Sequence, residues 1–216
     1  MKKIFFLGLV VGLVLSLSSA AHANMLVNSS FETPMGDNAD PDGWWGLREF
    51  PTATDVVMKT ATAEQYSGAQ SGRITMTANT STPRNLWAGW GQEVSIGAGQ
   101  QITASAWLKA TARNYANPKL QLEFKDMGGV QINKTSVAAP AGTFDWTNLS
   151  TTVTTPAGTE TVLVNLLVEK TSGGASGEFY WDDASIDVAA VPEPASLLLL
   201  GSGLVGLLGV SRKKKK

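Results

Sequence analysis

The stretch Ile102–Leu108, which reads ITASAWL, decides the fold more clearly than any other part of the chain. Apolar residues recur at positions 102, 104, 106 and 108. Because successive side chains of a β-strand point to opposite faces, this spacing gives the strand one apolar face. The stretch therefore predicts a strand whose even-numbered side chains enter a core, while odd-numbered ones such as Trp107 face outward.

The same period of two recurs through residues 24–190, the part that we expect to fold. It appears at residues 74–78, 94–96, 120–124 and 162–168, and turn signals such as GAG at 97–99 and PAG at 156–158 separate the runs. No stretch of these residues keeps a convincing helical period. The pattern predicts an all-β sandwich of about nine or ten antiparallel strands in a single domain.

The N-terminal residues have the features of a secretory signal peptide. Lys2 and Lys3 precede an apolar run at residues 4–17, and small residues at 21 and 23 follow it. Signal peptidase requires small side chains at these two positions before the bond that it cuts. We expect residues 1–23 to be a signal peptide that is cleaved after Ala23.

The C-terminal residues form three consecutive parts. Val191-Pro192-Glu193-Pro194 comes first, an uncharged apolar run at residues 195–210 follows, and Arg212 and four lysines end the chain. A helix over the sixteen apolar residues would be about 24 Å long, short of the ~30 Å hydrocarbon core of a membrane. The basic residues favour a cytoplasmic end, which places the rest of the chain outside.

Together these three parts resemble the PEP-CTERM sorting signal, with Pro192, Glu193 and Pro194 as its motif. The resemblance covers residues 191–216 and implies a short transmembrane helix and processing by an exosortase of a Gram-negative bacterium. The protein would be anchored transiently in the inner membrane and then released to the cell surface or the extracellular matrix. The alternative is an ordinary C-terminal membrane anchor.

Composition narrows the possible chemistry. The chain has no cysteine, and its one histidine, His22, lies within the predicted leader. A Ser-His-Asp or Cys-His nucleophile, the usual zinc ligands and a disulfide are therefore excluded from the exported body. Residues 24–190 hold ten basic and seventeen acidic side chains, a net charge near −7. Such a surface repels phosphate, so we expect no nucleic-acid partner.

Five segments between residues 24 and 190 occur in an order that resembles jelly-roll carbohydrate-binding modules of the family four, nine and twenty-two type. The segments are LVNSSFE at 26–32, PDGW at 41–44, YSGAQS at 66–71, GQEVSI at 91–96 and FYWDDASI at 179–186. The resemblance implies two packed antiparallel sheets, glycan binding at a concave face or at edge loops, and often a structural calcium ion.

Matching the family pattern places the calcium ligands at Glu32 and Asp182. If Ile186 and Val188 face the core, strand alternation turns Asp182 inward as well, and a buried carboxylate needs a partner. A cation with oxygen ligands would supply one. The alternative is that Asp182 caps a turn or pairs with a basic residue.

Seven tryptophans are many for a chain of this size, and aromatic rings stack on the C–H faces of sugars. The predicted sugar-binding residues are Trp87, Trp107, Trp45 and Tyr115. The alternative for any one ring is packing in the core, which we expect for Trp44, Trp146 and Trp181.

Three functions follow. The leading one is an exported surface or matrix protein that binds polysaccharide without catalysis, with exopolysaccharide as its partner. The second is a structural coat protein without a specific ligand. The third is a glycan-active enzyme that uses carboxylates, but no motif selects a pair such as Glu123 and Glu169.

Overall fold

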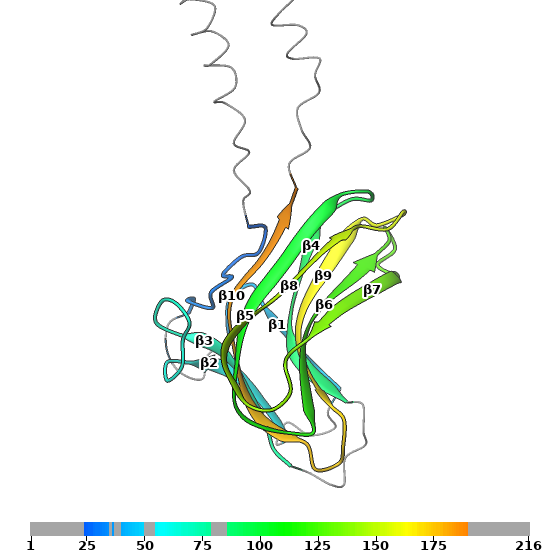
Figure 1. Ribbon diagram of the computed structural model, residues 1–216. Coiled ribbons are helices and arrows are strands. Elements are labelled where there is room, and N and C mark those ends of the chain that lie inside the picture. Colours follow the sequence, from blue (N-terminus) through cyan, green and yellow to red (C-terminus); the bar gives the residue numbers. More distant parts are fainter. Residues whose placement is uncertain (1–23, 35, 37–39, 50–54, 79–85, 190–216) are drawn as a thin grey trace, which may run out of the picture. The chain divides into compact units, whose positions relative to one another are not determined.

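Ten strands make up two five-stranded antiparallel sheets in the computed structural model of the protein (Figure 1). The structure describes residues 24–34, 36, 40–49, 55–78 and 86–189, and these residues contain no helix. The strands are β1 (Trp45–Arg48), β2 (Val56–Ala61), β3 (Ser71–Met76), β4 (Trp87–Ser95), β5 (Gln101–Asn114), β6 (Ala116–Lys125), β7 (Gln131–Ala138), β8 (Phe144–Thr154), β9 (Thr161–Lys170) and β10 (Ser176–Val188).

The first sheet has the order β1-β4-β9-β6-β7, and the second has the order β2-β3-β10-β5-β8. Figure 1 shows them as two curved layers, one behind the other. All pairs of neighbouring strands are antiparallel. The predicted all-β sandwich of nine or ten strands is therefore confirmed.

The core lies between the inner faces of the two sheets. Ile102 and Leu108 of β5 are fully buried there, as are Leu120 and Leu122 of β6. Burying one such aliphatic side chain contributes about 1.5–3 kcal/mol, and the alternating strands bury one at every second position. The period of two that is visible in the sequence thus forms the contact between the sheets.

The outer face of the first sheet is unusual because several of its side chains are also buried. Leu163, Asn165 and Leu167 of β9 alternate with the core residues of that strand, yet all three are almost inaccessible. The strand registers place Asn165 between Gly91 of β4 and Gln121 of β6. Side chains of the neighbouring strands therefore cover the outer side of β9, and a groove lies over this strand.

A β-bulge in β10 changes which face its residues occupy. Asp182 pairs with Trp107, whereas Ser185 pairs with Ser105, so β10 uses one residue more than β5 over this interval. Asp183 in the bulge has a positive φ of 41°. The prediction that Asp182 lies on the same side as Ile186 is wrong, because the extra residue moves Asp182 to the outer side with Trp107.

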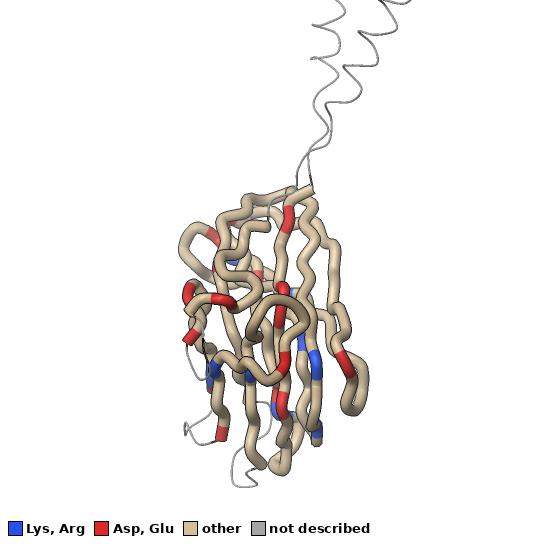
Figure 2. Tube along the Cα trace, turned by 90° about the vertical axis from the view of Figure 1, so that its left-hand side faces the viewer, with Lys and Arg blue, Asp and Glu red and all other residues tan. Residues whose placement is uncertain are grey.

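The first and last described residues lie at one end of the sandwich (Figures 1 and 2). Asn24 donates a hydrogen bond from Nδ2 to the carbonyl of Ala184 at 2.9 Å, and Met25 donates its N–H to Ile186 at 3.1 Å. Among the described residues, no helix is long and apolar enough to cross a membrane. The predicted signal peptide and C-terminal helix lie outside these residues, as do Ala23, Pro192, Glu193 and Pro194.

Candidate functional site

A groove of about 370 Å³ crosses the outer face of the first sheet. Its walls come from β1, β4, β6, β7 and β9, so the groove runs across nearly the whole width of the sheet. Leu47 and Trp87 contribute apolar surface, while Gln121, Asn165 and Lys134 contribute polar groups. A site that combines apolar walls with a few placed polar groups can bind a small ligand or one segment of a polymer.

Two glycines of β4 let aromatic and aliphatic side chains lie close to the sheet. A Cβ atom on Gly91 would come within 2.6 Å of Leu47 Cδ1 and 2.9 Å of Trp45 Nε1. Gly89 faces the same side, where a Cβ would collide with the backbone of β9. Trp45 and Leu47 therefore lie across Gly91, in a position that side chains on β4 would otherwise fill.

The floor of the groove contains a small amide and carboxylate cluster. Gln121 Nε2 donates to Glu123 Oε1 at 2.7 Å, and Asn165 Nδ2 donates to the same oxygen at 3.1 Å. Asn165 is only 1% exposed, and its Oδ1 accepts no hydrogen bond from the described residues. An unsatisfied buried acceptor is costly, so a ligand hydroxyl that donates to it would gain a favourable hydrogen bond.

Ion pairs hold the charged side chains along this face. Lys119 Nζ lies 3.2 Å from Glu169 Oε2, and Lys125 Nζ lies 3.0 Å from Glu93 Oε2. Thr161 also donates to Glu93, and this hydrogen bond is the largest cause of the lowered pKa of Glu93, followed by that from Lys125. These lysines and glutamates neutralise one another, so the face carries no strong field of one sign.

The structure brings some of the predicted sugar-binding residues together and separates others. Trp45 is 42% exposed on β1, and Trp87 begins β4 next to the groove. Tyr115, 64% exposed, forms the β5–β6 turn beside a different hollow of about 510 Å³. Trp87 of β4 pairs with Glu169 of β9, and Glu169 pairs on its other side with Asn117 of β6. Because Tyr115 lies two residues before Asn117, the rings of Trp87 and Tyr115 lie at the same end of the first sheet.

Trp107 lies on the other sheet. It faces outward from β5, as predicted, but it is not part of the groove. Trp44 and Trp181 are buried in the core, as expected. The expectation for Trp146 is wrong, because this ring lies on the outer side of β8 against Tyr66.

Sequence reasoning missed the polar floor of the groove. Asn165 lies in the run VLVNLLV at 162–168, where apolar residues occupy both faces of the strand. Apolar outward positions in a strand of an antiparallel sheet indicate a covered outer face, and a single Asn among them indicates a polar contact there. That signal was present in the sequence.

Glu32 and Asp182, the predicted calcium ligands, both bind backbone N–H groups of one loop. Asp182 Oδ2 accepts hydrogen bonds from Tyr66 N at 2.8 Å and Ser67 N at 3.1 Å. Glu32 Oε1 accepts from Ala69 N at 3.0 Å and from the next amide, at residue 70, at 3.2 Å. Burial raises the pKa of Asp182 to about 6 against the opposing effect of these donors.

These contacts fit a clamp on the β2–β3 loop better than a calcium site, because N–H groups point at oxygens that a cation would need. Among the described residues, no three acidic or histidine side chains cluster as a metal site would require. Calcium binding at Glu32 and Asp182 stays a prediction.

Comparison with protein families identifies the end of the chain. A family described as the PEP-CTERM protein-sorting motif matches residues 190–213, which confirms the sorting signal expected at residues 191–216. The motif indicates export and a membrane-anchored sorting signal. No curated protein sequence matches the chain.

Solved structures show the fold of the body. The CBM22-1 xylan-binding domain of Paenibacillus barcinonensis Xyn10C is similar with a TM-score of 0.51 at 18% identity, over 80% of this chain and 100% of that domain. The enzymatically active domain of bacteriophage CBA120 tailspike protein 4 is similar with a TM-score of 0.58 at 15% identity. The match covers 76% of this chain but only 21% of the tailspike chain.

A Stig cyclase from Fischerella sp. TAU is also similar, with a TM-score of 0.59 at 10% identity over 80% of this chain and 100% of that one. At such identities the likeness shows a fold of the jelly-roll carbohydrate-binding type and nothing about activity. Because proteins of several activities share this fold, function has to be argued from the site.

Proposed function

We propose that this protein is an exported surface or extracellular-matrix protein whose β-sandwich binds polysaccharide without catalysis in the groove on the first sheet. The observation that carries the proposal is the buried Asn165 in the groove floor, whose Oδ1 has no donor among the described residues. Trp87 in the groove and the exposed Trp45 beside it supply rings for the sugar faces, and the amide groups meet the hydroxyls.

The route outward is part of the proposal. Signal peptidase would cut after Ala23 during passage through the general secretory pathway. An exosortase would then act at the motif Pro192-Glu193-Pro194, after transient anchoring in the inner membrane of a Gram-negative bacterium. The sorting motif at residues 190–213 supports the exosortase step. Exopolysaccharide outside the cell would be the ligand that the released body meets first.

The groove geometry argues against catalysis by its carboxylates. Glu169 pairs with Asn117, and Glu123 is six residues farther along β6, which at ~3.3 Å per residue separates the two by roughly 20 Å. Glycosidases need two carboxyl groups about 5 to 9.5 Å apart. Glu93 shares a cross-strand row with Glu123, but Glu93 is held by Lys125 and Thr161, and Glu123 is held by two amide groups of the groove floor.

Affinity gel electrophoresis tests the binding proposal. The purified full-length protein, kept in mild detergent, is run through gels that contain soluble xylan, chitosan or alginate. Trp87→Ala should lower the affinity for the polysaccharide in the gel about tenfold. The reason is that stacking of the ring on a sugar contributes roughly 1 kcal/mol in addition to the burial of apolar area. Met127→Ala is the matched control, since Met127 is exposed on the β6–β7 turn and outside the groove.

The outcome also separates the alternatives. Retention that is equal for wild type and Trp87→Ala on every gel would favour a structural coat protein without a ligand. Release of reducing sugar from any of the three polysaccharides would instead favour an enzyme. We expect Trp87→Ala to be retained less than wild type and Met127→Ala, and we expect no release of reducing sugar.

A further inference from the structure

Three aromatic rings meet on the outer face of the second sheet, on the opposite side of the sandwich from the groove. Tyr66 of the β2–β3 loop stacks on Trp107 of β5, with centroids 3.9 Å apart and 14° between the ring planes. Trp146 of β8 meets Tyr66 edge-on at 5.9 Å. Tyr66 keeps 42% of its surface exposed although one of its faces rests on Trp107. It therefore presents a flat ring to solvent.

The loop that carries Tyr66 is fixed by the clamp described above. The backbone N–H of Tyr66 itself donates to Asp182, which pairs with Trp107 across the β5–β10 ladder. Ser67 Oγ donates to Asp183 Oδ1 at 2.8 Å, which secures the next residue of the loop. The ring is thus held in place before any ligand arrives, and such preorganisation reduces the entropy cost of binding.

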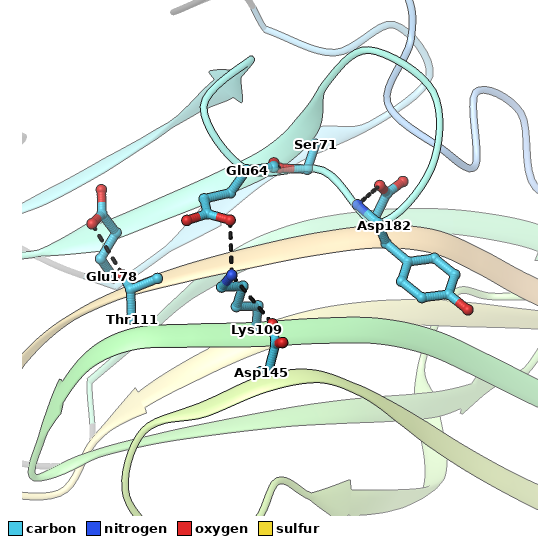
Figure 3. A network of polar contacts seen from close by, with 8 residues as sticks. Glu64, Ser71, Lys109, Thr111, Asp145, Glu178 and Asp182 are labelled. Atoms are coloured by element: carbon cyan, nitrogen blue, oxygen red, sulfur yellow. Dashed lines mark hydrogen bonds and ion pairs between the residues drawn. The ribbon is translucent and has the colours of Figure 1, made fainter.

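Charged groups surround a hollow of about 410 Å³ next to these rings. Lys109, two residues after Trp107 on the same face of β5, lies 2.9 Å from Glu64 Oε2 and 3.2 Å from Asp145 Oδ1 (Figure 3). The hydrogen bond with Glu64 is the main cause of the raised pKa of Lys109, so the lysine stays charged. Two carboxylates thus face one ammonium group, and Asp145 is 83% exposed.

The chemistry of this place selects a class of ligand. Spare carboxylate oxygens accept hydrogen bonds from hydroxyl and ammonium groups. The net negative charge of Glu64, Lys109 and Asp145 repels uronic acids and attracts amino sugars. The exposed ring of Tyr66 and the carboxylate acceptors that line the neighbouring hollow together form a contact surface for neutral or amino-bearing sugars.

We propose that Tyr66, supported by Trp107 and flanked by Glu64 and Asp145, is a second glycan-contact surface, so that one protein molecule bridges two polysaccharide chains. This inference rests on the proposed binding in the groove. The two surfaces lie on the outer faces of sheets that pack about 10 Å apart, with the core between them. Two separate chains can therefore occupy them at once, which turns a binding protein into a cross-linker.

The test compares wild type with Tyr66→Ala, Trp87→Ala and the double variant, with Met127→Ala as the control and the full-length protein in mild detergent throughout. Retention is measured in gels that contain soluble xylan, chitosan or alginate, and cross-linking is measured as turbidity when protein is added to the same polymers. Tyr66→Ala should lower retention on chitosan about tenfold and leave retention through the groove. Turbidity should require both rings.

Two further variants keep the test informative if Tyr66→Ala disturbs the loop. Tyr66→Phe retains the stacked ring and should retain cross-linking. Asp145→Asn changes an exposed side chain, and it should weaken binding to chitosan severalfold while leaving xylan unchanged, because it removes a negative charge. A severalfold weaker binding of chitosan by Asp145→Asn, together with normal binding by Tyr66→Phe, supports the second surface.

The outcomes separate this inference from the groove. Equal retention and equal turbidity of wild type, Tyr66→Ala and Asp145→Asn, with Trp87→Ala impaired, would overturn the second surface and leave the groove. Normal retention in Trp87→Ala as well as in Tyr66→Ala would overturn both. Turbidity that Trp87→Ala and Tyr66→Ala each abolish, while each still binds, is the result that the inference predicts.

Discussion

Asp182 of β10 lies directly opposite Trp107 of β5, while Ile186 of β10 lies opposite Ala104. Four residues along one strand thus correspond to three along the other. Because side chains alternate with a period of two, the extra residue places Asp182 and Ile186 on opposite faces of the second sheet. The carboxylate is consequently available to the β2–β3 loop, and through this loop Tyr66 reaches Trp107.

The buried Asp182 should make stability depend on pH. Its folded-state pKa is raised to about 6, above the ordinary value near 3.9, so the folded protein holds this proton more tightly than the unfolded chain does. The contribution of Asp182 to the free energy of unfolding should fall as pH rises from about 4 to 6, by about 1.4 kcal/mol per unit at most.

Urea unfolding of wild type and Asp182→Asn at several pH values measures this effect. The variant keeps one acceptor oxygen for the loop but cannot ionise, so the difference in free energy of unfolding should shift in its favour as pH rises from 4 to 6. Asp187→Asn, on the same strand, is the control. A difference that stays constant across the window would contradict the assignment.

Gly68 should be essential to the loop. Its φ is +65°, and a Cβ atom there would collide with Glu32 Oε1, which accepts the N–H of Ala69. We expect Gly68→Ala to lower the free energy of unfolding by more than Gly142→Ala, which has a similar φ of +75° but no atom within 4 Å of its added Cβ. Backbone strain alone should lower the free energy of unfolding of Gly142→Ala by about 1 kcal/mol.

Midpoints of urea unfolding for these two alanine variants give the comparison. A larger loss at position 68 assigns the excess to the carboxylate contact. Equal losses would show that the loop adjusts and that Glu32 is not a fixed clamp.

Gly91 should control how closely Trp45 and Leu47 lie against the first sheet. The methyl group of Gly91→Ala would need space that Leu47 Cδ1 and Trp45 Nε1 occupy. We expect this variant to fold and to bind polysaccharide severalfold more weakly in affinity gels. Gly97→Ala, where nothing lies within 4 Å of the added Cβ, should bind as wild type does. Unchanged retention of Gly91→Ala would remove this part of the sheet from the site.

Calcium binding has a direct measurement. A cation that binds only the folded state raises the melting temperature by mass action, so the resemblance predicts a higher melting temperature in calcium than in chelator. Glu32→Gln should abolish the rise. A melting temperature that is the same in both solutions would contradict calcium binding at Glu32 and Asp182 and leave both carboxylates as the clamp on the β2–β3 loop.

The sequence predicted the elements that depend on local alternation and missed those that depend on contacts between distant segments. The strand at 102–108 and the outward position of Trp107 follow from a period of two, and both are confirmed. The face of Asp182 could not be derived, because the bulge at Asp183 breaks that period. Trp146 was misplaced for a different reason, since its partner Tyr66 is eighty residues away in a loop.

The groove shows the same limit. Trp87 and Trp45 were among the aromatic residues predicted to bind sugar, and the structure places both on the β1–β4 side of the first sheet. The single Asn165 in an apolar run marked a polar contact, but the residues of β1 and β6 that share the groove with it are distant in sequence, so the groove itself could not be predicted. The residue types suited to binding sugar could be recognised in the sequence, whereas the groove that brings them together could not.

The position of β10 has a mechanical consequence. This strand is the middle one of its sheet, with β3 on one side and β5 on the other, and it ends at Val188, next to the last described residue. A pull on that end is directed along the strand, and antiparallel hydrogen bonds lie across it, so two ladders resist in shear rather than opening one bond at a time.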